Sequence, residues 1–180
     1  MATKKIRVHE LAKELGLTNK ETLDLSVDLG IGVKSHSSSI EDPQADRVRR
    51  KADQLGLTPR ARIFDQTTVG CDPVKMLEGP IPATKKILER NGITMDDIDL
   101  FEINEAFAPV VAAWRRVHNP DMDRVNFNGG AMALGHPLGS TGARLITTLL
   151  HELERSDREI GFVTMCCGGG LGTGTLIQRV

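Results

Sequence analysis

The sequence predicts an α/β domain that follows a small, mainly helical module. After residue 62, strand-like and helix-like segments alternate in the order β-α-β-α-β-α-β-β, which is typical of a mostly parallel sheet that ends in an antiparallel pair. Before residue 57, signals for helix starts and stops dominate. The charge balance also changes: residues 1–60 hold 11 Lys and Arg against 9 Asp and Glu, and residues 61–180 hold 12 against 15. We therefore expect domains at 1–57 and 62–180, joined by a linker at 58–61.

Helix-capping signals define the module. Thr18 and Glu21 are the ends of a T-N-K-E capping box, which opens a helix that Gly30 stops. Asp42 and Pro43 predict a cap and a first-turn proline for a polar helix that runs to residue 55. The other expected elements are a strand at 5–9 and a short helix at 10–15.

Periodicity and turn residues locate the elements of the second domain. Strands are expected at 62–69, 98–103, 124–127, 160–165 and 173–180, and helices at 82–90, 105–117 and 140–154. Asn91-Gly92 ends the first of these helices, and Thr94 to Asp97 forms a capped turn.

Composition excludes several classes of protein. Hydrophobic residues make up 39% and charged residues 26% of the chain, and the formal net charge is −1, so neither nucleic acid nor an anionic membrane is an expected partner. Three cysteines, two of them adjacent, imply no disulfide framework and indicate a reducing cytoplasm. The first residues lack the apolar core of a signal peptide, and no apolar run is long enough to cross a bilayer. We expect a cytoplasmic protein with no membrane partner.

The stretch NFNGGAMALGHPLGSTGAR, residues 126–144, gathers glycines around one histidine. A phosphate-binding loop would need Lys and then Ser or Thr after its second glycine, whereas Gly135 is followed by His136 and Pro137. The functional interpretation is that the tight loop presents His136 for proton transfer near neutral pH. The alternative is an ordinary loop histidine bonded to a carbonyl group.

The stretch TMCCGGGLGTG follows the expected strand at 160–165. A thiol at Cys166 could act as a nucleophile, acid or base, and backbone N–H groups in the glycine turn could meet a developing oxyanion. The alternatives are a buried structural cysteine and a plain tight hairpin. Cys166 and Cys167 are adjacent and lack the spacing of metal ligands, so we expect no metal site.

The stretch FEINEAFAPV lies between a strand and a helix. Asn104 is suited to cap that helix, and Glu105 to favour its dipole as a first-turn acid. The functional alternative for Asn104 is a side-chain amide that orients a water molecule or a carbonyl group.

Together these three stretches resemble the C-terminal part of thiolases. That family shows N-E-A-F, then N-x-N-G-G-A-x-A-x-G-H-P-x-G-x-[ST]-G-A-R, then C-x-G-G-G-x-G. The same motifs stand here at 104–107, 126–144 and 166–172, in the family's order. The segment VGCDPVKMLEGPIPATKKILERNG is similar as well. The resemblance covers residues 61–180 and implies an α/β half-domain: a five-stranded mixed sheet with helices on both faces.

The resemblance also implies roles for individual residues. His136 corresponds to the base that activates a nucleophilic cysteine, and Cys166 to the cysteine that shuttles a proton at the α-carbon of an acyl-CoA. The N–H of Gly168 belongs to one oxyanion hole, and Asn104, through a water molecule, forms the other with His136. Phe107 is expected against the bound coenzyme A thioester, which is a substrate, and no tightly bound cofactor is expected.

In the family, the nucleophilic cysteine lies in the N-terminal half, which has no counterpart in these 180 residues. Cys71 stands in the VGCDP connection, where the family needs no cysteine, and we expect Cys71→Ser to change nothing catalytic. The expected function is therefore thiolase-class acyl transfer in truncated form, the Claisen condensation or thiolysis of a 3-ketoacyl-CoA, inactive alone. Expected partners are acyl-CoA, a complementary thiolase N-terminal half or a second copy of the chain.

Residues 1–60 resemble the small N-terminal domain of bacterial translation initiation factor 2, on the stretch KIRVHELAKELGLTNKETLDLSVDLGIGVKSHSSSIED. No GTPase motif accompanies it. This leaves two alternatives to an enzyme: a non-catalytic binding module with weak ribosome or RNA contact through residues 1–60, and a gene-fusion remnant. The helix at 140–154 bears a broad apolar surface that a lone half-domain would have to cover.

Overall fold

The computed structural model describes residues 5–56 and 59–180, and the chain divides into two compact units. The first unit comprises residues 1–62 together with Val180, and the second comprises residues 63–179. Part of the linker expected at 58–61 lies outside the described residues, as do residues 1–4 and 57 of the expected first domain.

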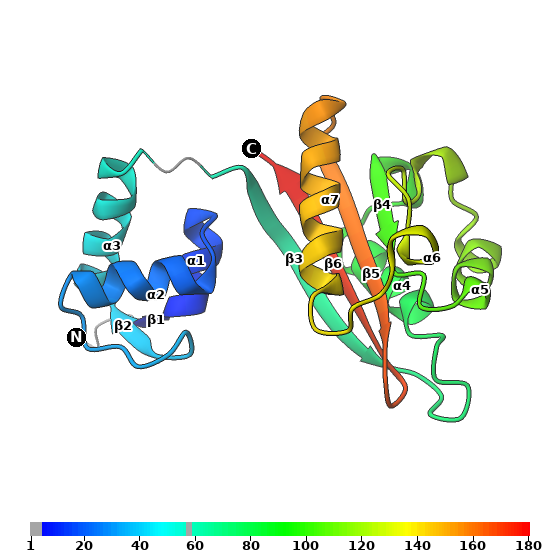
Figure 1. Ribbon diagram of the computed structural model, residues 1–180, viewed down its shortest axis with the longest axis horizontal. Helices are drawn as coiled ribbons and strands as arrows, with labels where there is room; N and C mark the ends of the chain where they lie inside the picture. The colour runs from blue at the N-terminus through cyan, green and yellow to red at the C-terminus, as the bar shows by residue number, and fades with distance from the viewer. Residues whose placement is uncertain (1–4, 57–58) are drawn as a thin grey trace. The chain divides into compact units, whose positions relative to one another are not determined.

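The first unit is a small helical module with a two-stranded antiparallel sheet, in which Ile6 pairs with Ile40 (Figure 1). Its core cluster is apolar and contains Val8, Leu11, Ile31, Ile40, Ala45 and Val48. Its elements, in chain order, are β1 (Lys5–Arg7), α1 (Val8–Leu15), α2 (Asn19–Asp28), β2 (Ser39–Glu41) and α3 (Asp42–Gln54).

Capping explains where the two longer helices of this unit begin. The Thr18 hydroxyl accepts the N–H of Glu21 at 3.1 Å, and the Glu21 carboxylate accepts the N–H of Thr18 at 2.8 Å, which confirms the predicted capping box. The predicted cap at Asp42 is wrong, because Glu41 is the N-cap and its N–H is accepted by the Gln44 side chain at 3.0 Å. Helix α3 therefore begins at Asp42, one residue before Pro43, whereas the sequence predicted that Asp42 was the cap.

The second unit is a mixed α/β fold, as predicted. Its sheet has the strand order β3-β6-β5-β4, in which β4 and β5 are parallel and β5 and β6 antiparallel. The antiparallel pair at the end of the chain was expected from the sequence. The elements are β3 (Ala61–Gly70), α4 (Pro80–Asn91), β4 (Leu100–Ile103), α5 (Ala108–His118), α6 (Ala131–Leu134), α7 (Thr141–Arg155), β5 (Ile160–Cys167) and β6 (Leu171–Arg179), with single 3-10 turns η1 (Met95–Asp97) and η2 (Met122–Arg124).

The fifth strand expected at 124–127 is reduced to one parallel bridge between Val125 and Phe101. Residues up to Arg124 form the turn η2, and Asn126 adopts a left-handed backbone with φ of 49°. Only Val125 is left extended between them, so the sheet of the second unit has four strands in the described chain.

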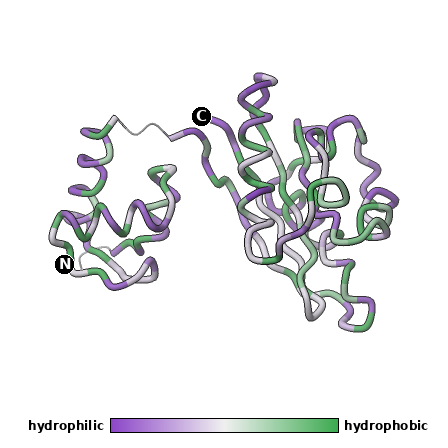
Figure 2. The backbone as a smooth tube through the Cα atoms, viewed as in Figure 1, coloured by the Kyte–Doolittle hydropathy of each residue, from purple (hydrophilic) through white to green (hydrophobic). Residues whose placement is uncertain are grey.

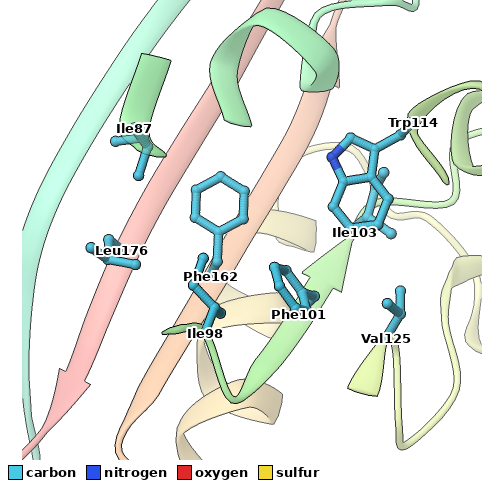
Figure 3. Packing of buried hydrophobic residues seen from close by; sticks show 8 residues of the cluster. All are labelled: Ile87, Ile98, Phe101, Ile103, Trp114, Val125, Phe162 and Leu176. Carbon is cyan, nitrogen blue, oxygen red and sulfur yellow. The ribbon is translucent and has the colours of Figure 1, made fainter. Parts of the chain in front are cut away.

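Helices cover both faces of this sheet, as predicted. Phe162 packs in a core cluster with Ile87 of α4 and Trp114 of α5, and Figure 3 shows these rings and side chains gathered on one side of the strands. The neighbouring Gly161 faces the opposite side, where an added Cβ would meet Leu149 of α7 at 2.7 Å. Helix α7 runs alongside β5 in Figure 1.

Helix α7 is amphipathic, and hydrophobic and hydrophilic stretches alternate along it in Figure 2. Leu145, Leu149 and Leu153 are buried in their own unit, whereas Ala143 is exposed and Ile146 is half-buried. The apolar surface expected on this helix is thus partly covered by its own sheet. Among the described helices, none combines the length and the apolarity that a membrane span requires.

Candidate active site

His136 lies in the loop between α6 and α7, directly after Gly135, whose φ of 89° favours glycine. Its Nδ1 is 2.7 Å from the Thr141 hydroxyl, and that hydroxyl donates to the carbonyl oxygen of Pro137 at 3.0 Å. Because the hydroxyl proton is used in this way, Thr141 accepts the Nδ1–H of the imidazole. The lone pair of the ring therefore resides on Nε2, which is the state required of a general base.

Asn104 directly follows β4 and is fully buried. Its N–H donates to the carbonyl oxygen of Thr164 at 2.9 Å, and its side-chain Nδ2 lies 3.4 Å from Nε2 of His136. The interpretation of Asn104 as a helix cap is wrong, because α5 begins at Ala108 and its N-cap is Phe107. The side chain is thus free to contact His136.

Cys166 and Cys167 end β5, and the turn that follows uses left-handed glycines at 169 and 170. Cys166 is buried, with 7% of its surface exposed, and pairs with Gly172 across the hairpin. Burial raises the pKa of the Cys166 thiol, a hydrogen bond to the backbone opposes this, and the nearby thiols of Cys167 and Cys71 add to the rise. The group therefore carries its proton at neutral pH, which suits a proton donor.

The hairpin packs against the loop before α4 with no room for side chains. An added Cβ on Gly172 would lie 2.3 Å from the backbone of Gly79, and one on Gly79 would lie 2.4 Å from the carbonyl oxygen of Leu171. Both positions therefore require glycine. This contact fixes the β5–β6 turn, which carries Gly168, against the rest of the unit.

A cavity of about 390 Å³ unites the predicted residues from three separate stretches of the chain. Asn104 reaches His136 from the end of β4, so all five predicted residues lie at or beside this cavity. The lining is mostly apolar and includes exposed Phe107 and Leu138. The lining residues are Leu77, Ala106, Phe107, His136, Leu138, Met165, Cys166, Cys167 and Gly168.

Cys71 is not among the residues that line the cavity. Its thiol donates to the carbonyl oxygen of Met76 at 2.9 Å, and its N–H donates to that of Gly170 at 2.7 Å. Within the described residues, no group of three His, Cys, Asp or Glu side chains is suited to hold a metal ion.

Sequence reasoning did not find the roles of two residues in this region. Thr141 was not singled out, although a hydroxyl five residues after a loop histidine, at the start of a helix, is a usable signal for an orienting partner. Glu105 was expected in the first turn of a helix, but α5 starts at Ala108, and the carboxylate instead contacts the backbone of Met132.

Comparison with known protein families agrees with the two units. Residues 57–179 match the family model described as the C-terminal domain of thiolase, and residues 3–54 match the N-terminal region of translation initiation factor IF-2.

Individual relatives of the chain include thiolases and an acetyl-CoA acetyltransferase. The chain is 47% identical over 177 residues to a steroid 3-ketoacyl-CoA thiolase of Mycobacterium tuberculosis, an alignment that covers 97% of this chain and 44% of the relative. It is 48% identical over 151 residues to a 3-ketoacyl-CoA thiolase of Cronobacter sakazakii, and 45% identical over 150 residues to an acetyl-CoA acetyltransferase of Syntrophomonas wolfei. These alignments cover 80% and 81% of this chain, and 39% and 38% of the relatives. The chain thus spans less than half the length of these relatives.

Proposed function

The chain belongs to the thiolase family through the C-terminal domain at residues 57–179, and on that premise we propose that its cavity processes coenzyme A thioesters. The proposed reaction is that of the thiolase class, in which a carbon–carbon bond β to a thioester carbonyl is made by Claisen condensation or broken by thiolysis. The observation that carries the proposal is that His136, Cys166 and Gly168 line one cavity, with Asn104 beside it in contact with His136.

The tautomer of His136 supports its role as a base. With Nδ1–H donated to Thr141, Nε2 can take the proton of a cysteine thiol and convert it into a thiolate nucleophile. In the second half of the reaction, the same ring and the Asn104 amide, through a water molecule, stabilise negative charge on a thioester oxygen.

The burial of Cys166 supports a role as proton shuttle. A thiol whose pKa is raised holds its proton at neutral pH and can donate it to the α-carbon of the acyl-CoA enolate that leaves when the carbon–carbon bond breaks. The N–H of Gly168, which lines the same cavity, belongs to the second oxyanion site.

No cysteine of these 180 residues is well placed to accept an acyl group. Cys166 is assigned to proton transfer, Cys167 is its neighbour and its pKa is raised by burial, and Cys71 does not line the cavity. We therefore propose that the 180 residues form no acyl-enzyme alone. A thiolase N-terminal half would supply the nucleophilic cysteine as a complementary chain, and a homo-oligomer is the alternative assembly.

Complementation tests this function. The chain is mixed with the N-terminal half of the Syntrophomonas wolfei relative, and thiolysis of acetoacetyl-CoA by coenzyme A is followed through loss of enolate absorbance. We expect turnover from the mixture, none from either part, and none when the chain carries His136→Asn. A mixed complex that forms, as shown by sizing chromatography, but turns nothing over would contradict the proposal.

A second function has one specific observation in its favour. Arg47, Arg50 and Lys51 of α3 border a hollow of about 310 Å³ in the first unit, which would suit weak contact with an RNA phosphate backbone. Fluorescence anisotropy with single-stranded RNA is expected to show weak binding that falls steeply with salt and is lost in Arg50→Gln/Lys51→Gln. Equal binding by both proteins would refute this contact.

A further inference from the structure

The carboxylate of Glu105 joins two segments that are far apart in the sequence. Its Oε2 accepts the N–H of Met132 at 2.9 Å, and its Oε1 accepts the side-chain N–H of Asn126 at 2.8 Å. Asn126 in turn exchanges two hydrogen bonds with the backbone of Ile103, at 2.8 Å and 3.0 Å. The end of β4 and the glycine-rich loop are therefore held together by one carboxylate and one amide.

Gly130 leaves the space that this carboxylate occupies. A Cβ added at Gly130 would lie 1.9 Å from Cδ of Glu105 and 2.1 Å and 2.2 Å from its two oxygens, and these three atoms are the nearest ones to that position. The backbone φ of Gly130 is −106°, so its conformation alone would permit alanine. Glycine is thus required at this position because the Glu105 carboxylate occupies the space of a Cβ.

The segment that carries His136 has few apolar contacts of its own. Helix α6 has only four residues, with Ala131 buried but Met132 64% and Leu134 56% exposed. The position of α6 therefore depends on polar contacts. One of them, from the Met132 N–H to Glu105, connects the loop to the end of β4. His136 follows two residues after this helix ends.

Glu105 is also the direct neighbour of Asn104. The same carboxylate thus connects the backbone that carries Asn104 to the loop that carries His136, and the side chains of these two residues meet at 3.4 Å. We propose that Glu105 is a positioning residue, which sets the separation of Asn104 and His136 by clamping the Met132 N–H and the Asn126 amide. Its part in acyl transfer rests on the function proposed above, whereas the clamp itself does not.

Three variants of the full chain separate clamping from space filling. Glu105→Gln keeps the volume but places an amide NH₂ against one of two donors, the N–H of Met132 or the amide of Asn126. Glu105→Ala removes both the contacts and the volume. Glu105→Asp keeps the charge, but its shorter side chain cannot hold both partners.

The readout is the pair of ring-nitrogen NMR signals of His136, in protein labelled with ¹⁵N-histidine. The wild-type protein is expected to show one protonated and one unprotonated nitrogen. In Glu105→Gln and Glu105→Ala, the Nε2 signal is expected to shift because the Asn104 amide moves away from it, while Nδ1 keeps its proton against Thr141. The shift in Glu105→Asp should be smaller. A folded Glu105→Gln protein with unchanged His136 signals would overturn the proposal, because a merely structural role lowers the melting temperature without changing the ring.

A double-mutant cycle tests the geometry. Gly130→Ala is expected to lower the melting temperature in the wild-type and Glu105→Gln backgrounds, where the clash persists, and to lower it much less in Glu105→Ala. Equal losses in all three backgrounds would show that Gly130 and Glu105 do not share this space, against the proposal.

The wild-type protein gives a measurement that needs no variant to fold. The amide proton of Met132 is expected to resist exchange with solvent compared with an unstructured peptide, although its side chain is exposed. Exchange at the unstructured rate would overturn the clamp.

In the complemented enzyme, Glu105→Gln is expected to lower kcat much more than it changes KM. If the wild-type chain does not complement the N-terminal half although the NMR results are as expected, the proposed function is wrong. The clamp by Glu105 is unaffected by that outcome.

Discussion

Nδ1 of His136 lies 2.7 Å from the hydroxyl oxygen of Thr141, the first residue of α7. This contact links the loop histidine to a helix that is anchored on the sheet through Leu145 and Leu149. The imidazole is therefore oriented by a rigid element, although it stands on a glycine-rich loop. The orientation leaves Nε2 for the cavity and for Asn104.

Removal of the Thr141 hydroxyl is expected to release the ring. Thr141→Val leaves the Nδ1–H without its acceptor, so the two ¹⁵N signals of His136 should approach each other as tautomers mix. The second unit should also lose about 1 kcal/mol of stability, since the Nδ1–H of His136 loses its acceptor, whereas the Pro137 carbonyl keeps the backbone N–H groups of Ser140 and Thr141. Thr141→Ser, which keeps the hydroxyl, is the matched control and should retain the wild-type spectrum. Wild-type signals in Thr141→Val would disprove the orienting role.

The reactivity of Cys166 is expected to be low. With Cys71 and Cys167 replaced by serine, iodoacetamide should alkylate the remaining thiol more slowly at pH 8 than it alkylates a model peptide thiol. The pKa of Cys166 is raised above its ordinary value of 9.0, so less thiolate is present at that pH. The rate should still rise above pH 9, where the model thiol levels off. Urea-unfolded protein is the control, and a folded protein that reacts as fast as this control would contradict the assignment.

Glu102 makes the stability of the second unit depend on pH. Burial raises its pKa to about 7 from 4.5, the charges of Glu105 and Glu152 add to this, and Arg144 opposes it. As the pH rises from 4.5 to 7, the unfolded state loses this proton first. Stability therefore falls across this window, by an amount on the order of 3 kcal/mol, and no further above it.

Glu102→Gln is expected to remove that decline. Urea unfolding, followed by the fluorescence of Trp114 in the core of this unit, compares the two proteins at pH 5 and pH 8. The variant should gain stability relative to the wild-type protein between these pH values. An identical pH dependence of the two proteins would show that Glu102 ionises normally.

Two glycines of the hairpin region make a matched pair for a packing test. Gly172→Ala should destabilise the unit by more than about 3 kcal/mol, because the new Cβ would lie 2.3 Å from backbone atoms of Gly79 that cannot move independently. Gly168→Ala should leave the melting temperature nearly unchanged, because a Cβ there meets no atom within 4 Å. Calorimetry on both variants measures their melting temperatures and unfolding enthalpies. A stable Gly172→Ala protein would mean that the hairpin and the Gly79 loop are not in contact.

Local sequence signals predicted local structure well. The Thr18–Glu21 capping box and the glycine at 92 that ends α4 are recognisable because cap and helix are adjacent in sequence. The same reasoning failed at Asn104 and Glu105, which look like a cap and a first-turn acid. There, Pro109 in the first turn of α5 was the better signal for where that helix starts.

The arrangement of the site depends on contacts between distant residues. The sequence motifs named Asn104, His136 and Cys166 through their likeness to a family. Neither the bond from Thr141 to His136 nor the space that Gly130 leaves for Glu105 can be seen in a periodic pattern. The expected strand at 124–127 does not form for a related reason. Arg124 belongs to the turn η2, and the side chain of Asn126 is hydrogen-bonded to Ile103 of β4.

We propose that the residues around the cavity form the part of a thiolase site that handles the α-carbon of a thioester. Exchange of the methyl hydrogens of acetyl-CoA in D₂O, measured by proton NMR, is the first test of this role because the step needs no nucleophilic cysteine. We expect exchange above the buffer rate, which increases with pH as the Cys166 thiol ionises and falls to the buffer rate in Cys166→Ser. Exchange at the buffer rate with the wild-type chain, or an equal rate with the variant, would contradict it.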